Sequence, residues 1–389
     1  MGSTEGPGTT HVSHVPPPGH EDAREPLVPP LGAMVVNLAR EPVIAVDAMG
    51  GDYAPDEIVA GALAAQREHR LTTLLAGPPA RLRPVIARLG GGSELRVVPA
   101  EDVVGMGEGA LAGLRRPRSS IAVACQLVRR GQASAVVSAG STGAIVASAR
   151  HRLLSLPSVP RPGLAVVLPT HPKPTVLIDA GATADPKPEM LVQFGHLGVA
   201  YAQIALGTPV PRVGLLTIGA EPGKGNALTR RAHELLAAEP QHGGLPLSFA
   251  GNIEGGDLMG AAVDVIVTDG FTGNVALKTL EGAMRFAASE LRTALTSTRA
   301  AKMGALLQRR GLRELGHRLE PESYGGAALL GMGGTVVIAH GASTARAVTA
   351  ACALAANLTR GDITERIKER IGVTEPRRPT HFLRRDRER

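Results

Sequence analysis

Three lysines stand in loops rich in glycine and proline, or close to the start of an expected helix, where an ammonium group can bind an anion. They are Lys187 in ADPKP, Lys224 in GKGN and Lys278 in GNVALK. A lysine ammonium is a compact point charge on a flexible stem, which suits phosphate. Because the chain uses arginine far more than lysine, we predict that each contacts an anionic ligand. A surface position or a carboxylate partner is the alternative for each lysine.

Two loops place glycine with small hydroxyl or amide residues directly before an expected helix, at 138–143 (SAGSTG) and 270–274 (GFTGN). The first N–H groups of a helix lack backbone partners and carry the positive end of its dipole, so such a loop can bind an anion. Either loop alone is more typical of a structural turn, but several together favour a phosphate-like ligand. The candidate contacts in these loops, in DAMGG and in GKGN are Asp47, Gly50, Gly51, Ser138, Gly140, Ser141, Thr142, Gly143, Asn226, Gly273 and Asn274.

Other motifs with a defined chemistry are missing from the sequence. It contains no GxxxxGK[ST] loop, no strand followed by GxGxxG, no GxSxG elbow and no HExxH. Its two cysteines, Cys125 and Cys352, both have apolar neighbours, which argues against a disulfide framework and a cysteine-based zinc site. With 3 Tyr, 5 Phe and no Trp, the chain offers few aromatic faces for stacking bases. We therefore expect no metal, no cofactor and no nucleic-acid partner.

Short β-branched runs, glycine-rich loops and longer Ala/Leu-rich stretches alternate along most of the chain. Runs such as RVGLLTIG and TVVIAHG are continuously apolar, which is typical of strands buried on both faces. This alternation predicts an α/β fold with a mostly parallel sheet and helices on both faces. Ligands of such sheets bind at the carboxyl ends of the strands, where this chain concentrates Gly, Asp, Asn, Thr and Lys.

The 389 residues divide into one domain and two tails. Residues 1–40 are rich in Pro, Gly and His and are expected to be disordered, residues 41–372 form the domain, and residues 373–389 form a basic tail. A helical hairpin is expected over about 282–318, with its turn near 296–298. Since the sequence has neither a signal segment nor a long apolar window, we expect a soluble, cytoplasmic protein.

The expected hairpin carries two apolar stripes. The first follows the spacing of one helix face: Met284, Ala288, Leu291 and Leu295. The second stands among basic residues: Met303, Leu306 and Leu307. Packing inside a dimer is one interpretation of this surface. Reversible contact with an anionic membrane is the other, because a basic amphipathic tip is suited to a membrane interface.

Taken in order, the loops resemble the phosphate acyltransferases of bacterial phospholipid synthesis. The resemblance covers roughly residues 43–357 and leaves out both tails. It rests on the segments at 44–63, 138–144, 179–194, 213–226, 249–259, 264–282, 324–331 and 338–343. The chain departs from the family pattern at four loop positions: Ser141 and Thr183 in place of Asn, Pro222 in place of an acid, and Gly256 in place of a basic residue.

The resemblance implies that the protein converts acyl-ACP (an acyl group on acyl carrier protein) and inorganic phosphate to acyl phosphate and free carrier. The product would supply a membrane enzyme that acylates glycerol 3-phosphate. The resemblance also implies a homodimer, peripheral membrane contact, and a fold similar to phosphotransacetylase and isocitrate-dehydrogenase-like proteins.

In this reaction phosphate is already an anion and a thiol leaves readily, so positioning and charge stabilisation should dominate. The three lysines would bind phosphate or phosphopantetheine charge, Asn252 and Asn274 would donate to the oxyanion, and Asp47, Asp269 and His340 would orient them or move a proton. For the two acids, caps and loop hydrogen bonds are the alternative, and for His340 a core position. Three other functions stay open: a phosphotransacetylase-like enzyme using acyl-CoA, a decarboxylating dehydrogenase, and a non-catalytic phosphate or lipid sensor.

Overall fold

The computed structural model describes residues 41–92, 95–238, 245–260, 262–319 and 324–372. Both predicted tails, 1–40 and 373–389, lie outside the described residues. The strands are β1 (Val43–Asp47), β2 (Thr72–Gly77), β3 (Arg96–Pro99), β4 (Ala135–Ser138), β5 (Gly163–Leu168), β6 (Thr175–Ile178), β7 (Arg212–Leu216), β8 (Ser248–Ile253), β9 (Val265–Val267), β10 (Ala327–Leu330) and β11 (Thr335–Ile338). The helices are α1 (Asp56–His69), α2 (Pro79–Arg88), α3 (Ala110–Arg115), α4 (Ser120–Arg129), α5 (Thr142–Leu153), α6 (Pro188–Ala205), α7 (Ala227–Ala238), the 3₁₀ helix η1 (Gly255–Met259), α8 (Gly270–Thr296), α9 (Arg299–Leu307), α10 (Arg309–Leu319), α11 (Ala345–Arg360) and α12 (Ile363–Arg370).

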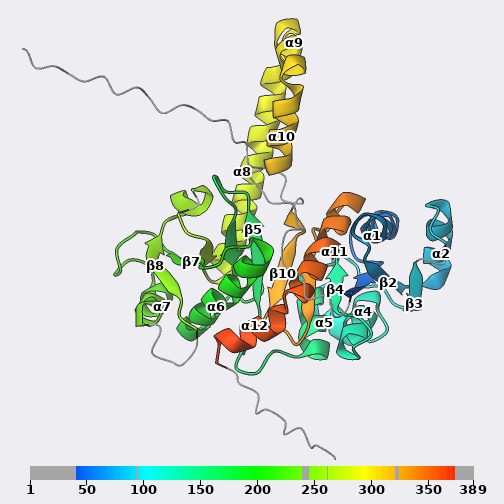
Figure 1. Cartoon of the computed structure of the whole chain (residues 1–389), viewed down its shortest axis with the longest axis horizontal. Coiled ribbons are helices and arrows are strands. Elements are labelled where there is room, and N and C mark those ends of the chain that lie inside the picture. Colours follow the sequence, from blue (N-terminus) through cyan, green and yellow to red (C-terminus); the bar gives the residue numbers. More distant parts are fainter. Residues whose placement is uncertain (1–40, 93–94, 239–244, 261, 320–323, 373–389) are drawn as a thin grey trace, which may run out of the picture.

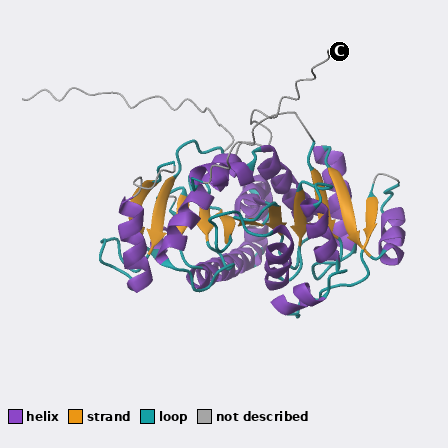
Figure 2. Cartoon of the chain, turned by 90° about the horizontal axis from the view of Figure 1, so that it is seen from below, coloured by secondary structure: helices purple, strands orange, loops and turns teal. Residues whose placement is uncertain are grey.

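All the described strands form one sheet, in the order β3-β2-β1-β4-β11-β10-β5-β6-β9-β7-β8. The central strands are buried on both faces because helices cover each side, as Figure 2 shows. The helices α1, α6, α11 and α12 bury their apolar side chains on one face, and α4, α5 and the start of α8 pack on the other. The predicted α/β fold with a mostly parallel sheet is confirmed.

Two strands in the middle of the sheet reverse the chain direction. The pairs β11–β10, β10–β5 and β5–β6 are antiparallel, whereas the other pairs are parallel. The group β3-β2-β1-β4-β11 therefore runs opposite to the group β6-β9-β7-β8, and the carboxyl ends of the two groups point in opposite directions. The sequence argument placed all carboxyl ends at one edge, and the reversal corrects it. In the strand order, only β10 and β5 lie between Ile338 at the end of β11 and Leu177 near the end of β6.

A long helical hairpin projects from the body of the molecule (Figure 1). Its first arm, α8, starts at Gly270 rather than near 282, because the Asp269 carboxylate accepts a hydrogen bond from the Thr272 N–H and caps the helix. The turn falls at Ser297–Thr298, as predicted, but the returning arm is broken at Gln308 into α9 and α10. Among the described residues, no helix is both long and apolar enough to span a bilayer.

Candidate functional site

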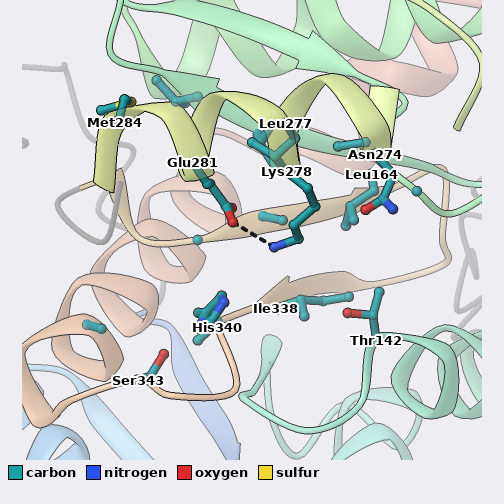
Figure 3. A pocket seen from close by; sticks show the side chains of 18 of the residues that line it. Thr142, Leu164, Asn274, Leu277, Lys278, Glu281, Met284, Ile338, His340 and Ser343 are labelled. Carbon is teal, nitrogen blue, oxygen red and sulfur yellow. Dashed lines mark hydrogen bonds and ion pairs between the residues drawn. The ribbon is translucent and has the colours of Figure 1, made fainter. Parts of the chain in front are cut away.

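A cavity of about 1880 Å³ lies between α5, α8 and the loop after β11. Its floor includes Leu164 of β5, Ala327 of β10 and Ile338 of β11, the strands around the direction reversal. Figure 3 shows that Lys278 on α8 lies across this space from His340 and Thr142. The cavity therefore collects residues that follow strands of both parallel groups.

Five of the predicted residues line this cavity together: Thr142, Gly143, Asn274, Lys278 and His340. Thr142 and Gly143 form the first turn of α5, and Asn274 and Lys278 occupy the first two turns of α8. Two helix starts thus border one cavity. At α8 the Gly270 N–H donates to the Thr183 carbonyl at 2.9 Å and the Thr272 N–H donates to Asp269 Oδ1 at 2.8 Å, whereas α5 has no side-chain cap, so its first N–H groups are the ones left for an anion. The His340 Nδ1 accepts a hydrogen bond from the Ala342 N–H at 3.2 Å, which fixes the ring and makes Nε2 the protonated nitrogen of a neutral imidazole.

The Lys278 ammonium donates a hydrogen bond to Glu281 Oε2 at 2.8 Å, and the Arg285 guanidinium lies 4.0 Å from the same oxygen. The Glu281 side chain is 15% exposed and also lines the cavity, whereas that of Lys278 is 51% exposed. Sequence reasoning missed Glu281, although an acid three residues after a lysine on a helix signals this pairing. The ion pair with Glu281 keeps the Lys278 ammonium at the cavity wall.

Ser343 is a second cavity residue that the sequence analysis missed. Its side chain is almost fully buried, and its hydroxyl has no hydrogen-bond partner among the described residues. It lies in the same loop as His340, whose carbonyl accepts a hydrogen bond from the Ser343 N–H at 3.0 Å. Buried hydroxyl groups are normally paired, so this one is available to a ligand. A serine in a loop gave no sequence signal that separated it from an ordinary turn residue.

The loop after β1 does not line the cavity; it packs against the loop that precedes α5. The Ser138 hydroxyl donates to Asp47 Oδ2 at 2.7 Å and accepts from the Gly140 N–H at 3.1 Å. Burial raises the pKa of Asp47, while hydrogen bonds from serine hydroxyls and loop N–H groups oppose that shift. A Cβ on Gly50 would lie 2.8 Å from the Gly140 nitrogen in the loop before α5, so the two loops pack too closely for a side chain there. These residues, with Gly51 and Ser141, position the start of α5.

The start of α8 is fixed in a similar way by Asp179. Its carboxylate, completely buried, accepts hydrogen bonds from the N–H groups of Leu164, Gly181, Ala182 and Thr183 at 2.6 to 3.0 Å. Burial raises the pKa of Asp179, and these four donors oppose the shift. A Cβ on Gly273 would lie 1.9 Å from the Asp179 carbonyl oxygen, so Gly273 is needed for close packing of backbone. Asp269 is engaged as the helix cap.

Four predicted residues lie away from the cavity: Lys187, Lys224, Asn226 and Asn252. Lys187 is exposed at the N-cap of α6. Asn226 Oδ1 accepts a hydrogen bond from the Thr229 N–H at the start of α7. The Lys224 ammonium nitrogen lies 4.0 Å from Glu221 Oε2.

Asn252 is held between two other groups. Its amide donates to the Glu221 carbonyl at 2.7 Å, and its oxygen lies 2.8 Å from His233 Nδ1. Asn252 therefore ties the 221–226 loop to β8 and does not line the cavity.

The cavity has a basic lining. Arg150, Arg285 and Arg292 join Lys278, and among the described lining residues the only carboxylate is Glu281. Within the described part of the chain, no group of three or more His, Cys, Asp or Glu side chains is arranged to hold a metal ion. The arrangement can bind an anion between the start of α5 and Lys278, beside an amide that can donate to an oxyanion.

Comparison with known proteins places these features in a family context. The family model described as fatty acid synthesis protein matches residues 43–366. A phosphate acyltransferase of Thermobifida fusca is 60% identical over 333 residues, covering 86% of this chain and 92% of the relative. A phosphate acyltransferase of Thermus thermophilus is 45% identical over 330 residues, covering 85% and 98%. A phosphotransacetylase structure from Streptococcus pyogenes has a TM-score of 0.57 at 15% identity, covering 83% and 95%, which shows likeness of fold alone.

Proposed function

Because this chain belongs to the fatty acid synthesis protein family and is a phosphate acyltransferase, we propose that it moves a long acyl chain from acyl carrier protein to inorganic phosphate. The products are acyl phosphate and the free carrier thiol. The observation that carries this proposal is the placement of Lys278 and Asn274, on α8, across one basic cavity from the start of α5.

The chemistry asks mainly for charge stabilisation and alignment. A phosphate oxygen attacks the thioester carbonyl carbon, a C–O bond forms, and the C–S bond breaks as the electron pair leaves with sulfur. A thiol with a pKa of about 8.5 is a good leaving group, and phosphate is ionised at neutral pH, so no strong base is needed. Lys278 and the N–H groups at the start of α5 would bind the phosphate, and the Asn274 amide would donate to the developing oxyanion. His340 and Ser343 would complete the polar wall opposite Lys278.

The deciding experiment traps the product. Purified protein with palmitoyl-ACP and phosphate should yield an acyl hydroxamate when hydroxylamine is added, and omission of phosphate should reduce the yield to the slow background from direct attack of hydroxylamine on the thioester. The alternative enzyme, similar to phosphotransacetylase, would instead turn over acetyl-CoA faster than palmitoyl-ACP. Tight binding of phosphate or lipid without any trapped product would favour the non-catalytic sensor.

We also propose that the protein is cytoplasmic and touches anionic membrane reversibly through the hairpin tip. Met303, Leu306 and Leu307 of α9 are 59%, 58% and 81% exposed, with basic residues beside them. An apolar stripe surrounded by basic side chains suits a bilayer interface. Such contact would bring an apolar acyl phosphate close to a membrane acyltransferase acting on glycerol 3-phosphate. The other expected stripe, from Met284 to Leu295, lines the cavity and takes no part in this membrane surface.

A homodimer is part of the same proposal. Phe271 and Phe286 on α8 are 67% and 69% exposed, which is unusual for aromatic side chains on a helix that also borders a functional cavity. Phe271 lines the cavity and Phe286 does not, so a second copy packed against the outer side of α8 would remove the Phe286 ring from water. Light scattering of the full chain tests this, with twice the mass of one chain expected.

A further inference from the structure

The cavity changes character along α8. Near Asn274 and Lys278 its walls are polar, and Glu281 is the last carboxylate on this side. Beyond Glu281 the hairpin contributes mainly apolar side chains from α8 and α10: Met284, Ala288, Leu291, Leu295, Leu312 and Leu315. One continuous cavity therefore joins a phosphate-binding end to an apolar end.

The hairpin does not fill this apolar end with its own side chains. Of the residues described in α8, only Gly270 and Gly273 are buried, and none is buried in α9. Leu291 is 43% exposed although it faces the cavity. Apolar groups left open to water in this way gain free energy when a ligand covers them.

The dimensions fit a long hydrocarbon chain. At about 1.5 Å of rise per residue, α8 extends about 26 Å from Lys278 to Leu295. The hydrocarbon core of a bilayer, two acyl chains thick, measures about 30 Å, so one chain needs about 15 Å or somewhat more when fully extended. A chain whose carbonyl lies beside Lys278 would end between Ala288 and Leu291.

We propose that the apolar end of the cavity binds the acyl chain of the substrate and that α8 limits the chain length the enzyme accepts. This inference rests on the proposed acyl transfer to phosphate. The carbonyl carbon lies between Asn274 and Lys278, and the chain follows Met284 towards Ala288 and Leu291. Because this apolar end is continuous with the phosphate end, an acyl chain is favoured as its occupant over a helix of a second copy.

The test is a substitution that shortens the apolar end of the cavity, which we call the groove. Ala288→Phe should lower kcat/KM for palmitoyl-ACP by at least about tenfold, because each methylene kept from water contributes a factor of about four. Activity with hexanoyl-ACP should stay close to wild type, since a short chain ends before Ala288. Ala294→Phe is the matched control, because Ala294 is exposed on the same helix outside the cavity and its variant should keep the wild-type chain-length profile. Leu291→Ala should shift the preference towards stearoyl-ACP.

A binding measurement separates this inference from the proposed function. Titration of the full-length protein with palmitate should show weaker binding to Ala288→Phe than to wild type or Ala294→Phe. If palmitate binding depends on Ala288 but no acyl phosphate forms, the proposed function fails and the groove stands. If palmitoyl-ACP is turned over and Ala288→Phe has an unchanged profile, the groove is refuted. Equal losses at every chain length, together with a change of mass in light scattering, would assign this face to contact between copies instead.

Discussion

Removing the Lys278 charge is the most direct test of the phosphate site. Lys278→Met keeps most of the apolar stem and deletes the ammonium that lies across the cavity from His340. A hydrogen bond to a charged group contributes about 1.5–3 kcal/mol. Lys278 must first leave Glu281, and an exposed pair of this kind contributes at most about 1 kcal/mol. The net loss should be about 1.5 kcal/mol, or roughly tenfold in kcat/KM for phosphate.

Initial rates measured against phosphate concentration, with acyl phosphate trapped by hydroxylamine, give this quantity directly. Lys302→Met is the matched control, because Lys302 is exposed on α9 and lies outside the cavity lining. The unfolding free energy of Lys278→Met should change little, since an i,i+3 ion pair on a helix contributes only about 0.2–0.5 kcal/mol.

A second substitution tests the role of Glu281. In the Lys278→Met background the Glu281 carboxylate has lost its nearest cation and repels phosphate, so adding Glu281→Gln should recover part of the lost affinity. Wild-type kinetics in a well-folded Lys278→Met protein would show that Lys278 does not bind phosphate. A loss that Glu281→Gln leaves untouched would refute the exchange of partners between Glu281 and phosphate.

Four further outcomes are expected. Gly273→Ala should lower the unfolding free energy in urea by at least about 2 kcal/mol, because its Cβ would lie 1.9 Å from the Asp179 carbonyl oxygen; a wild-type urea midpoint would contradict this packing. Burial lowers the pKa of His196 to about 4, so below about pH 6.5 the unfolded chain takes up a proton that the folded chain does not, and about 2 kcal/mol of stability should be lost between pH 7 and pH 5. His196→Leu should remove that part of the pH dependence in urea titrations, and an unchanged slope would show that other groups cause it. Leu307→Glu should weaken flotation with anionic vesicles while catalysis in solution is retained, and equal flotation would leave the tip without a membrane role. The KM for acyl-ACP should rise with salt more than the KM for phosphate, because the carrier is acidic and the chain has a net charge of +7; a salt-independent KM would remove electrostatic steering.

The sequence predicted the layers of the fold well because its signals there are local. Continuous apolar runs such as TVVI and TVLI became fully buried strands, and α5 starts at Thr142, inside the expected loop 138–143. The segment 270–274 was expected to be a loop but forms the first turn of α8, because Asp269 caps the helix. Asn274 and Lys278, in the first two turns of α8, line the cavity.

Strand direction depends on long-range pairing and could not be read from those runs. The antiparallel β5 and β10 look like any other apolar strand in the sequence, yet they form part of the cavity floor. Strand order is equally non-local. β7 and β8 are the two outermost strands beyond β9, so Lys224 and Asn252, which resembled ligand-binding residues by type, do not line the cavity. The stripe from Met284 to Leu295 was similarly visible as a periodicity, but whether it faced a cavity or a membrane depended on how the hairpin leaves the body.

The position of β11 has a consequence for how the chain is made. This strand pairs with β4, although almost 200 residues of chain, including the whole β5–β9 half of the sheet and the hairpin, separate the two. At about 5–20 residues per second, a ribosome needs about 10–40 s to deliver β11 after β4 has emerged. During that time the apolar edge of β4 has no strand partner, and an unpaired edge of this kind invites aggregation. The first half of the sheet therefore stays partly folded until the last tenth of the domain has been synthesised and β11 can pair with β4.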